Sequence, residues 1–185
     1  MNKQYVVLGL GIFGSTVVKT LSEYGCEILA IDKDPECVQR IAEYATKAVI
    51  GDVTDCEFLM DLGVNEFDVG VVAIGDHLEE CVLATMNLKD CGVPYVVAKA
   101  KNKRFKLVLE KIGADNVVRP EKDMGVRLAK TFLRKNITEL IELDDENSIA
   151  EIVVPQAWVG KTLNELNLRQ LAGINILGKR NLETN

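Results

Sequence analysis

Three glycines follow an apolar run near the N-terminus, and they restrict the fold more than any other feature of the sequence. Residues 4–14 read QYVVLGLGIFG, with Gly9, Gly11 and Gly14 spaced as G-x-G-x-x-G. In a strand–turn–helix unit the first glycine allows the tight turn, the second lets backbone amides approach a pyrophosphate, and the third lets the helix pack on its strand. We therefore expect a nucleotide-binding unit whose helix begins near Ile12 and directs free N–H groups at the phosphates.

An acidic residue at the appropriate distance supports the same interpretation. Asp32 follows the apolar run 28–31 and lies roughly 20 positions after Gly9, where a carboxylate binds the ribose hydroxyls of adenosine. Its two acceptor oxygens suit free hydroxyls and repel a 2′-phosphate, which disfavours NADP. Lys33, the next residue, is the one feature nearby that points the other way.

Strand and helix patterns alternate six times before residue 134. The expected strands are 6–8, 26–31, 47–50, 67–74, 94–98 and 116–118. Helix-start signals lie between them: Asp34-Pro35, capping-box patterns at Thr54/Glu57 and Asp76/Glu79, and Pro120 before a helix to Leu133. This alternation predicts an α/β fold with a Rossmann-like, doubly wound parallel six-stranded sheet and a long crossover helix.

The pattern changes at residues 134–136. We expect a nucleotide-binding domain over 1–134 and a partial α+β subdomain over 135–185, with strands at 137–143, 149–154 and 174–177 and a short helix at 162–166. The second part has only about 50 residues, near the lower size at which a domain folds alone. We therefore expect the chain to be a shortened version of a longer protein, or a fragment that a partner completes.

A doubly wound sheet binds its ligand at the carboxyl ends of its strands. The candidate binding residues are therefore Gly9, Leu10, Gly11, Ile12, Phe13, Gly14, Asp32, Lys33, Asp34, Asp52, Val53, Ala73, Ile74, Gly75, Lys99 and Glu121. Asp52 is placed either to meet an adenine edge or to cap the next helix. Lys99 either meets a phosphate or extends into solvent. Glu121 either stabilises a helix N-terminus or binds a divalent metal ion that bridges nucleotide phosphates.

Composition excludes several classes of function. The net charge of −6 argues against a nucleic-acid partner, because phosphate backbones need basic surfaces. No apolar stretch approaches the ~20 residues that span a bilayer, and no signal peptide is evident at the N-terminus. The five cysteines are odd in number and form no C-x-x-C pair, which is typical of reduced thiols in the cytosol. His77 is the single histidine, so a histidine-rich metal site is excluded.

The sequence provides little for catalysis. A dehydrogenase needs a substrate pocket and an acid–base residue near the nicotinamide, whereas His77 is expected at a solvated helix end. We therefore expect a protein that binds a nucleotide without turnover and responds by preferring one conformation. The alternatives are a small NAD-dependent oxidoreductase and a module that senses the NADH/NAD⁺ ratio.

Several motifs together resemble a known family. They are 9–14 (GLGIFG), 31–34 (IDKD), 51–54 (GDVT), 72–75 (VAIG) and, most specifically, 109–115 (LEKIGAD) followed by 119–125 (RPEKDMG). This combination resembles the regulator of K⁺ conductance (RCK, or KTN) domain of bacterial Ktr and Trk potassium uptake systems. The resemblance covers nearly the whole chain.

The resemblance implies a cytoplasmic, non-catalytic subunit that forms homodimers and commonly an eight-membered ring beneath a membrane potassium channel. It implies binding of NAD(H) or of ATP, ADP or AMP, and of cyclic di-AMP in the C-terminal subdomain. By position, the resemblance implies that Gly9 to Gly14 bind the phosphates and that Asp32 binds the ribose. It implies that Asp52 and Val53 contact the adenine. Glu121 lies near a divalent cation such as Mg²⁺ or Ca²⁺. Many ATP-responsive members have arginine at the position of Ile12, which favours NAD or a nucleotide with fewer phosphates here.

The predicted long helix carries an apolar stripe. Met124, Leu128 and Phe132 recur at spacings of four residues. We expect this stripe to pack against a second copy of the chain; the alternative is that it covers its own sheet.

Overall fold

A computed structural model describes residues 3–75, 77–133, 137–143 and 147–180. By its contacts the chain divides into two compact units, Met1–Gly125 and Val126–Asn185. The division falls inside helix α6 (Pro120–Leu133), which the sequence analysis assigned to the N-terminal domain.

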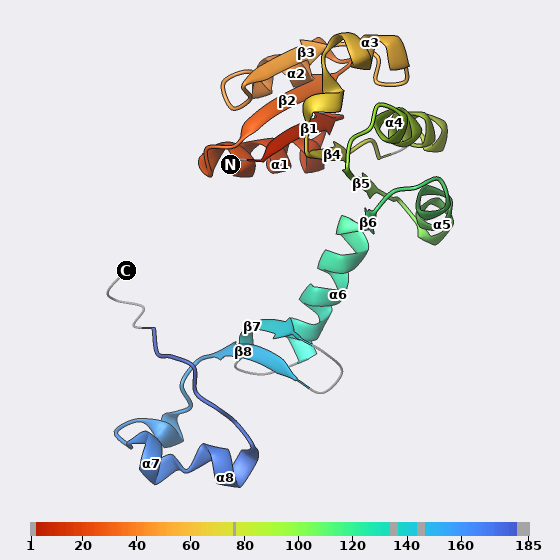
Figure 1. The fold of residues 1–185 in the computed structure, drawn as a ribbon. Coiled ribbons are helices and arrows are strands. Elements are labelled where there is room, and N and C mark those ends of the chain that lie inside the picture. Colours follow the sequence, from red (N-terminus) through yellow and green to blue (C-terminus); the bar gives the residue numbers. More distant parts are fainter. Residues whose placement is uncertain (1–2, 76, 134–136, 144–146, 181–185) are drawn as a thin grey trace. The chain divides into compact units, whose positions relative to one another are not determined.

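The N-terminal unit is built on one parallel sheet (Figure 1). Its strands are β1 (Gln4–Leu8), β2 (Glu27–Asp32), β3 (Lys47–Ile50), β4 (Val69–Val72), β5 (Tyr95–Lys99) and β6 (Asn116–Val118). They lie in the order β3-β2-β1-β4-β5-β6, and every pair is parallel. The direction of strand addition reverses between β1 and β4, which creates a crevice at the carboxyl ends of these strands. The Rossmann-like prediction is confirmed.

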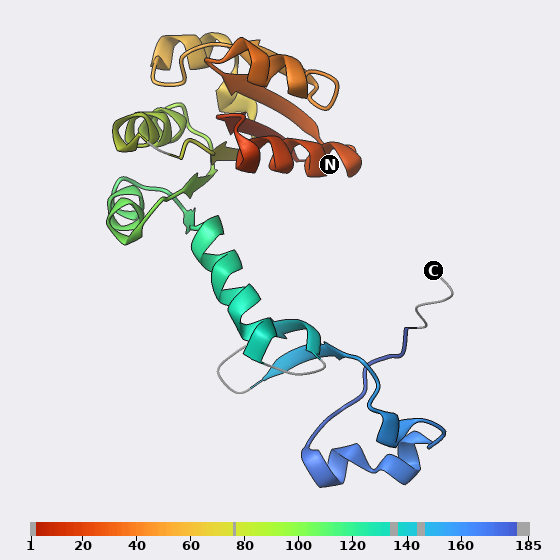
Figure 2. The same cartoon turned by 180° about the vertical axis from the view of Figure 1, so that it is seen from behind.

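Helices cover both faces of this sheet (Figures 1 and 2). They are α1 (Ile12–Glu23), α2 (Pro35–Ile41), α3 (Cys56–Asp61), η1 (Val64–Glu66), α4 (Leu78–Asp90) and α5 (Lys103–Lys111). Successive strand residues point to opposite faces, so Val7 packs in one core cluster with residues of α1 and α2. Val6 and Leu8 pack in the other, with residues of α3, α4 and α5.

Two of the expected helix caps are wrong. Helix α3 is capped by Asp55, whose Oδ1 accepts a hydrogen bond from the backbone N–H of Phe58. Thr54 lies one residue before this cap, and its hydroxyl donates to Asp52 Oδ1 at 2.7 Å. Helix α4 has His77 at its N-cap, so Asp76, which lies outside the described residues, is not the cap. The Asp34 cap and the proline at the start of α2 are confirmed.

The C-terminal unit contains an antiparallel pair and short helices. They are β7 (Ile137–Glu142), β8 (Ser148–Ile152), η2 (Gln156–Trp158), α7 (Leu163–Leu166) and α8 (Leu168–Ala172). A capping box between Thr162 and Glu165 starts α7. The expected strand at 174–177 is wrong: this run has no regular structure, because no strand among the described residues pairs with its backbone.

No helix in the described part of the chain combines the length and the apolar character needed to cross a membrane.

Candidate nucleotide-binding site

Two glycines of the loop after β1 are required by the fold itself. Gly9 has a φ of 92°, a conformation that L side chains rarely adopt, and its N–H donates to Ile31 O at 2.8 Å. A Cβ on Gly14 would lie 1.9 Å from the carbonyl oxygen of Gly9, because α1 passes so close to the strand end. Neither position tolerates a side chain, with or without a ligand.

Gly11 is different. A Cβ built on this residue meets no atom within 4 Å, and its φ of −63° is open to any amino acid. The fold therefore does not explain the glycine. The space beside Gly11 fits a group that approaches the backbone closely, as a pyrophosphate does in this motif.

The N-terminus of α1 also fits an anion. The helix begins at Ile12 as predicted, with Gly11 as a cap that provides no side-chain hydrogen bond. The first turn contains no acidic residue, so the free N–H groups of this turn have no side-chain acceptor within the helix itself. These groups can bind phosphate oxygens. Ile12 itself is 90% exposed, whereas Phe13 is half-buried.

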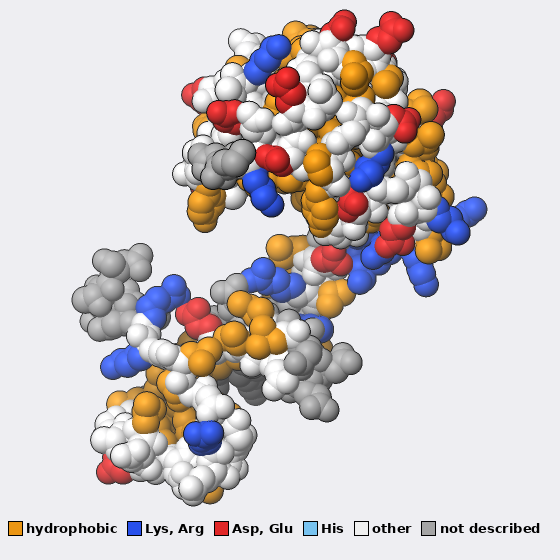
Figure 3. Space-filling model, in the orientation of Figure 1, with side chains coloured by type: hydrophobic (Ala, Val, Ile, Leu, Met, Phe, Trp, Pro, Cys, Tyr) orange, Lys and Arg blue, Asp and Glu red, His pale blue; other side chains and the backbone are white. Residues whose placement is uncertain are grey.

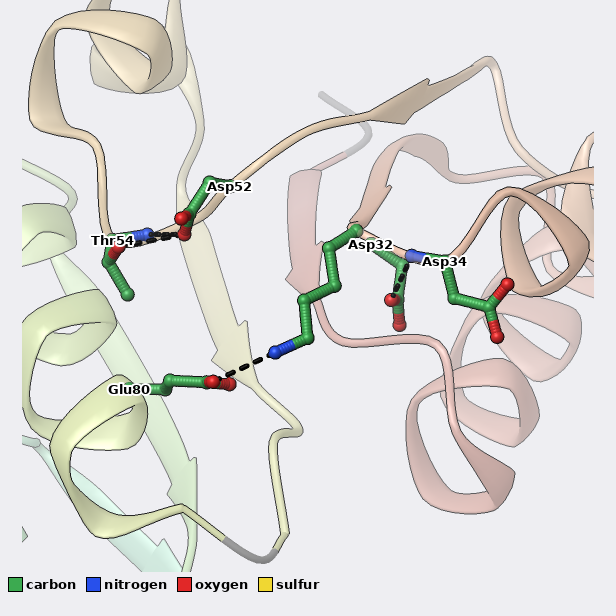
Figure 4. A network of polar contacts seen from close by, with 6 residues as sticks. Asp32, Asp34, Asp52, Thr54 and Glu80 are labelled. Atoms are coloured by element: carbon green, nitrogen blue, oxygen red, sulfur yellow. Dashed lines mark hydrogen bonds and ion pairs between the residues drawn. The ribbon is translucent and has the colours of Figure 1, made fainter.

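Asp32 ends β2 and is held against the glycine loop. Its Oδ2 accepts a hydrogen bond from the N–H of Leu10 at 2.5 Å. Its Oδ1 accepts one from the N–H of Asp34 at 2.9 Å (Figure 4). A carboxylate has about four acceptor positions, so two remain for other donors. The arrangement fixes the carboxylate beside Gly11 and leaves it able to bind a pair of hydroxyl groups.

The carboxylates of Asp34 and Asp52 each accept a hydrogen bond from the backbone N–H two residues further along the chain. Asp34 caps α2 by accepting from the N–H of Glu36 at 2.9 Å, which lowers the pKa of its carboxyl. Asp52 Oδ1 accepts from the N–H of Thr54 at 2.9 Å and from its hydroxyl, and these bonds lower the pKa of Asp52. Asp52 thus closes a turn and does not cap α3. Its second carboxylate oxygen is not used in that turn.

Val53, the next residue, is buried, and a side chain that sequence reasoning missed fixes its position. Asn87 of α4 donates through Nδ2 to Thr54 O at 2.9 Å and to Val53 O at 3.3 Å. This amide ties the segment 52–54 to the other side of the crevice. Asn87 sits inside a helical pattern, where no spacing rule distinguishes it from a surface residue.

An ion pair spans the same crevice. Lys33 extends from the end of β2 toward α4, where its Nζ lies 2.8 Å from Glu80 Oε1 (Figure 4). The hydrogen bond and the negative charge of Glu80 raise the pKa of Lys33, with smaller contributions from Asp52 and Asp32. Glu80 was not predicted as a site residue, because an acidic residue in the first turn of a helix is common and carries no specific signal.

A second ion pair lies at the ends of β5 and β6. Lys99 Nζ is 2.7 Å from Glu121 Oε1 and 5.9 Å from the centre of the Phe13 ring. The Lys99 side chain is only 15% exposed, which contradicts one of the two alternatives, that it merely extends into solvent. A Cβ on Gly75 would lie 3.4 Å from the same ammonium group. The Lys99 ammonium group therefore lies near three other candidate residues, Glu121, Gly75 and Phe13.

The remaining candidates line the end of β4. Ala73 is buried, and its N–H donates to Leu8 O at 2.7 Å; Ile74 is half-buried. Within the described part of the chain, no three histidine, cysteine or acidic residues are grouped to bind a metal ion. Glu121 supplies one carboxylate, so a metal ion there needs oxygen ligands from a bound nucleotide or water.

The sequence is similar to that of one known protein family. Residues 5–120 match the TrkA-N domain. The chain belongs to the TrkA-N family. The Ktr system potassium uptake protein C of Bacillus subtilis (strain 168) is 43% identical to it over 96% of this chain and 80% of that protein. The Ktr system potassium uptake protein A of the same organism is 42% identical over 95% of this chain and 79% of that protein.

Solved structures share the TrkA-N fold of this chain. The GsuK RCK domain superposes with a TM-score of 0.69 at 20% identity, covering 96% of this chain and 39% of that chain. The GsuK channel bound to NAD gives a TM-score of 0.65 at 20% identity, covering 94% and 32%. GsuK bound to ADP gives 0.57 at 16% identity, covering 91% and 51%.

Proposed function

We propose that this chain is the regulatory, nucleotide-binding subunit of a potassium uptake system. The observation that carries the proposal is its 43% identity, over 96% of its length, to a Ktr system potassium uptake protein. A match over this much of the chain extends across both units. It favours a regulatory role over the alternative of a small oxidoreductase.

The proposed ligand is an adenine nucleotide, either NAD(H) or one of ATP, ADP and AMP. Its phosphates lie at the α1 N-terminus beside Gly11, and Asp32 accepts hydrogen bonds from the ribose hydroxyls. The adenine lies against the segment that carries Asp52 and Val53. Support comes from the open space at Gly11 and from the carboxylate fixed next to it. The GsuK structures bound to NAD and to ADP share this fold.

The far end of the ligand is proposed to lie toward Lys99 and Glu121. The ammonium group of Lys99 can bind a terminal phosphate or the second half of a dinucleotide. Glu121 can contribute to a divalent cation, Mg²⁺ or Ca²⁺, that bridges phosphates. Because Ile12 brings no charge to the start of α1, a triphosphate gains less here than it would beside an arginine.

We propose that the subunit acts as a homodimer, and in an octameric ring, on the cytoplasmic face of a membrane potassium channel. Three exposed apolar residues of α6, Met124, Leu128 and Phe132, support a helix-mediated dimer. A nucleotide can change the channel only by the difference in its affinity for two dimer geometries, so its contacts must differ between them.

The ligand is tested by a competition titration. NAD⁺, NADH, ATP, ADP and AMP are titrated against wild type and against Ile12→Arg. The variant is expected to bind ATP about tenfold more tightly while AMP changes little, because the added guanidinium reaches only the phosphate tail. Equal changes for ATP and AMP would place the phosphates elsewhere.

The physiological role is tested in cells that lack their own Ktr regulatory subunit. The full-length wild-type protein is expressed with a Ktr membrane subunit and is expected to restore potassium uptake. The Asp32→Ala variant is expected to restore much less uptake. Oxidation of NADH in the presence of carbonyl substrates, at ordinary enzyme rates, would instead support an oxidoreductase. Sedimentation of a monomer at high concentration would remove the dimer from the proposal.

A further inference from the structure

Two cysteines, at the ends of two different helices, lie close together. Cys56 is the first residue of α3, and Cys91 directly follows the last residue of α4. Their Sγ atoms are 4.0 Å apart. The S–S distance in a disulfide is about 2.05 Å, so the sulfur atoms need to close a gap of about 2 Å.

The two thiols differ in access. Cys56 is exposed, so a small molecule in solution can reach its sulfur. Cys91 is buried in the core cluster that also contains Leu59 and Leu88, and this burial raises the pKa of its thiol to about 11. Cys91 is therefore protected from external reagents and open to reaction mainly with the sulfur of Cys56.

We propose that Cys56 and Cys91 form a reversible dithiol–disulfide pair that low-molecular-weight disulfides oxidise. The Cys56 thiolate attacks one sulfur of such a disulfide, forms a mixed disulfide and releases one thiolate. Cys91 then loses its proton to solvent and attacks Cys56 Sγ, which releases the second thiolate. The protein dithiol loses two electrons, the external disulfide gains them, and two small thiols are formed.

The position of the pair connects it to the candidate site. Asn87 precedes Cys91 by one helical turn and holds Val53 O and Thr54 O, as described above. Asp55, which caps α3, directly precedes Cys56. A covalent bond between the two sulfurs draws α3 toward α4 at the segment proposed to contact adenine. This consequence rests on the proposed function, whereas the thiol chemistry does not.

The chemistry is tested with oxidised glutathione as the probe. After incubation, remaining thiols are alkylated and the protein is digested and analysed by mass spectrometry. The expected product is a peptide pair linked through Cys56 and Cys91 in wild type and in the control Cys37→Ser. Cys56→Ser should give no link, and Cys91→Ala should retain a glutathione adduct on Cys56. Adducts on Cys56 that persist in wild type, or a link to another cysteine, would overturn the proposal.

The coupling is tested by titrating ADP against reduced and oxidised protein. Oxidation is expected to weaken binding about fivefold or more, within the usual range of coupling between sites, and to have no effect on Cys56→Ser. A complete cross-link with unchanged affinity would overturn the coupling. A complete cross-link in a protein that binds no adenine nucleotide in either state would contradict the proposed function while the redox pair stands.

Discussion

The two units of the molecule bury their apolar residues very differently. The N-terminal unit has a buried cluster on each face of its sheet. In residues 147–180 of the C-terminal unit, none of the described side chains is buried. Figure 3 shows hydrophobic side chains gathered at the surface of that unit, and Leu163, Leu171 and Leu177 are each more than half exposed.

This difference indicates where each unit obtains its stability. The N-terminal unit buries apolar surface on both faces of its sheet, and this burial stabilises the glycine loop after β1 in one conformation. The candidate site lies at the carboxyl edge of that sheet. The C-terminal unit leaves its apolar groups available for further contacts, in line with the proposed dimer. Substitutions in the first unit should therefore act on folding, and equivalent ones in the second should not.

The largest effect is expected at Gly14. Gly14→Ala forces a Cβ to within 1.9 Å of the Gly9 carbonyl oxygen, and both groups are backbone-anchored. We expect a loss of about 4 kcal/mol or more in the free energy of unfolding, or no folded protein. Gly178→Ala is the matched control, because its Cβ meets nothing within 4 Å. Urea unfolding compares the two variants. Similar losses of unfolding free energy in both would contradict the difference between the units.

A smaller effect is expected from removing one core side chain. Leu8 is fully buried in the middle of the sheet, so Leu8→Ala should cost about 2–5 kcal/mol. Leu177 is 77% exposed, and Leu177→Ala should stay within about 0.5 kcal/mol. The measurement is the thermal unfolding midpoint of each variant against wild type. A large loss at Leu177 would mean that the C-terminal unit has a core of its own.

The smallest effect is expected from Asp115, and it depends on pH. Burial acts to raise the pKa of this carboxyl, but the N–H of Val96 at 2.6 Å and the ammonium of Lys89 at 3.0 Å lower it overall. A lowered pKa in the folded state stabilises the protein above the unfolded pKa of about 3.9, and this contribution is lost as pH falls through the folded pKa.

Asp115→Asn should therefore cost about 1–3 kcal/mol at pH 7, and the difference from wild type should shrink as pH falls below about 4. Chemical denaturation at several pH values measures it. Glu165→Gln, in the C-terminal unit, removes an exposed carboxylate that accepts from Thr162 and should have much less effect. A constant difference across pH would contradict the role of the Asp115 charge.

The parallel sheet could be predicted because its signals are local. Each strand is a short apolar run, and proline or glycine marks most of the turns that follow. The strand at 174–177 was predicted on the same basis and is wrong, because an apolar run becomes a strand only when another strand pairs with it. The predicted cap of α3, Thr54, is wrong by one residue: Asp55 accepts from the N–H of Phe58, and the Thr54 hydroxyl donates to Asp52.

The candidate site divides in the same way. Gly11 and Asp32 follow a spacing rule that reflects how a strand, a turn and a helix must meet around a phosphate. Three other contacts join residues that are far apart in the sequence, with separations of between 33 and 47 positions. They are the Lys33–Glu80 ion pair, the hydrogen bonds of the Asn87 amide and the pair of neighbouring cysteines. Their meeting depends on how α4 lies against the ends of β2 and β3, which no single stretch of sequence encodes.

The most direct test of the nucleotide site is a calorimetric titration of ADP into wild type and Gly11→Ala. The structure leaves open space for the new Cβ, so the variant should unfold at nearly the same temperature as wild type. Its methyl group occupies the space proposed for the phosphates, and ADP should bind about tenfold more weakly or not at all. Equal affinity in the two proteins, at equal stability, would show that no phosphate lies against Gly11.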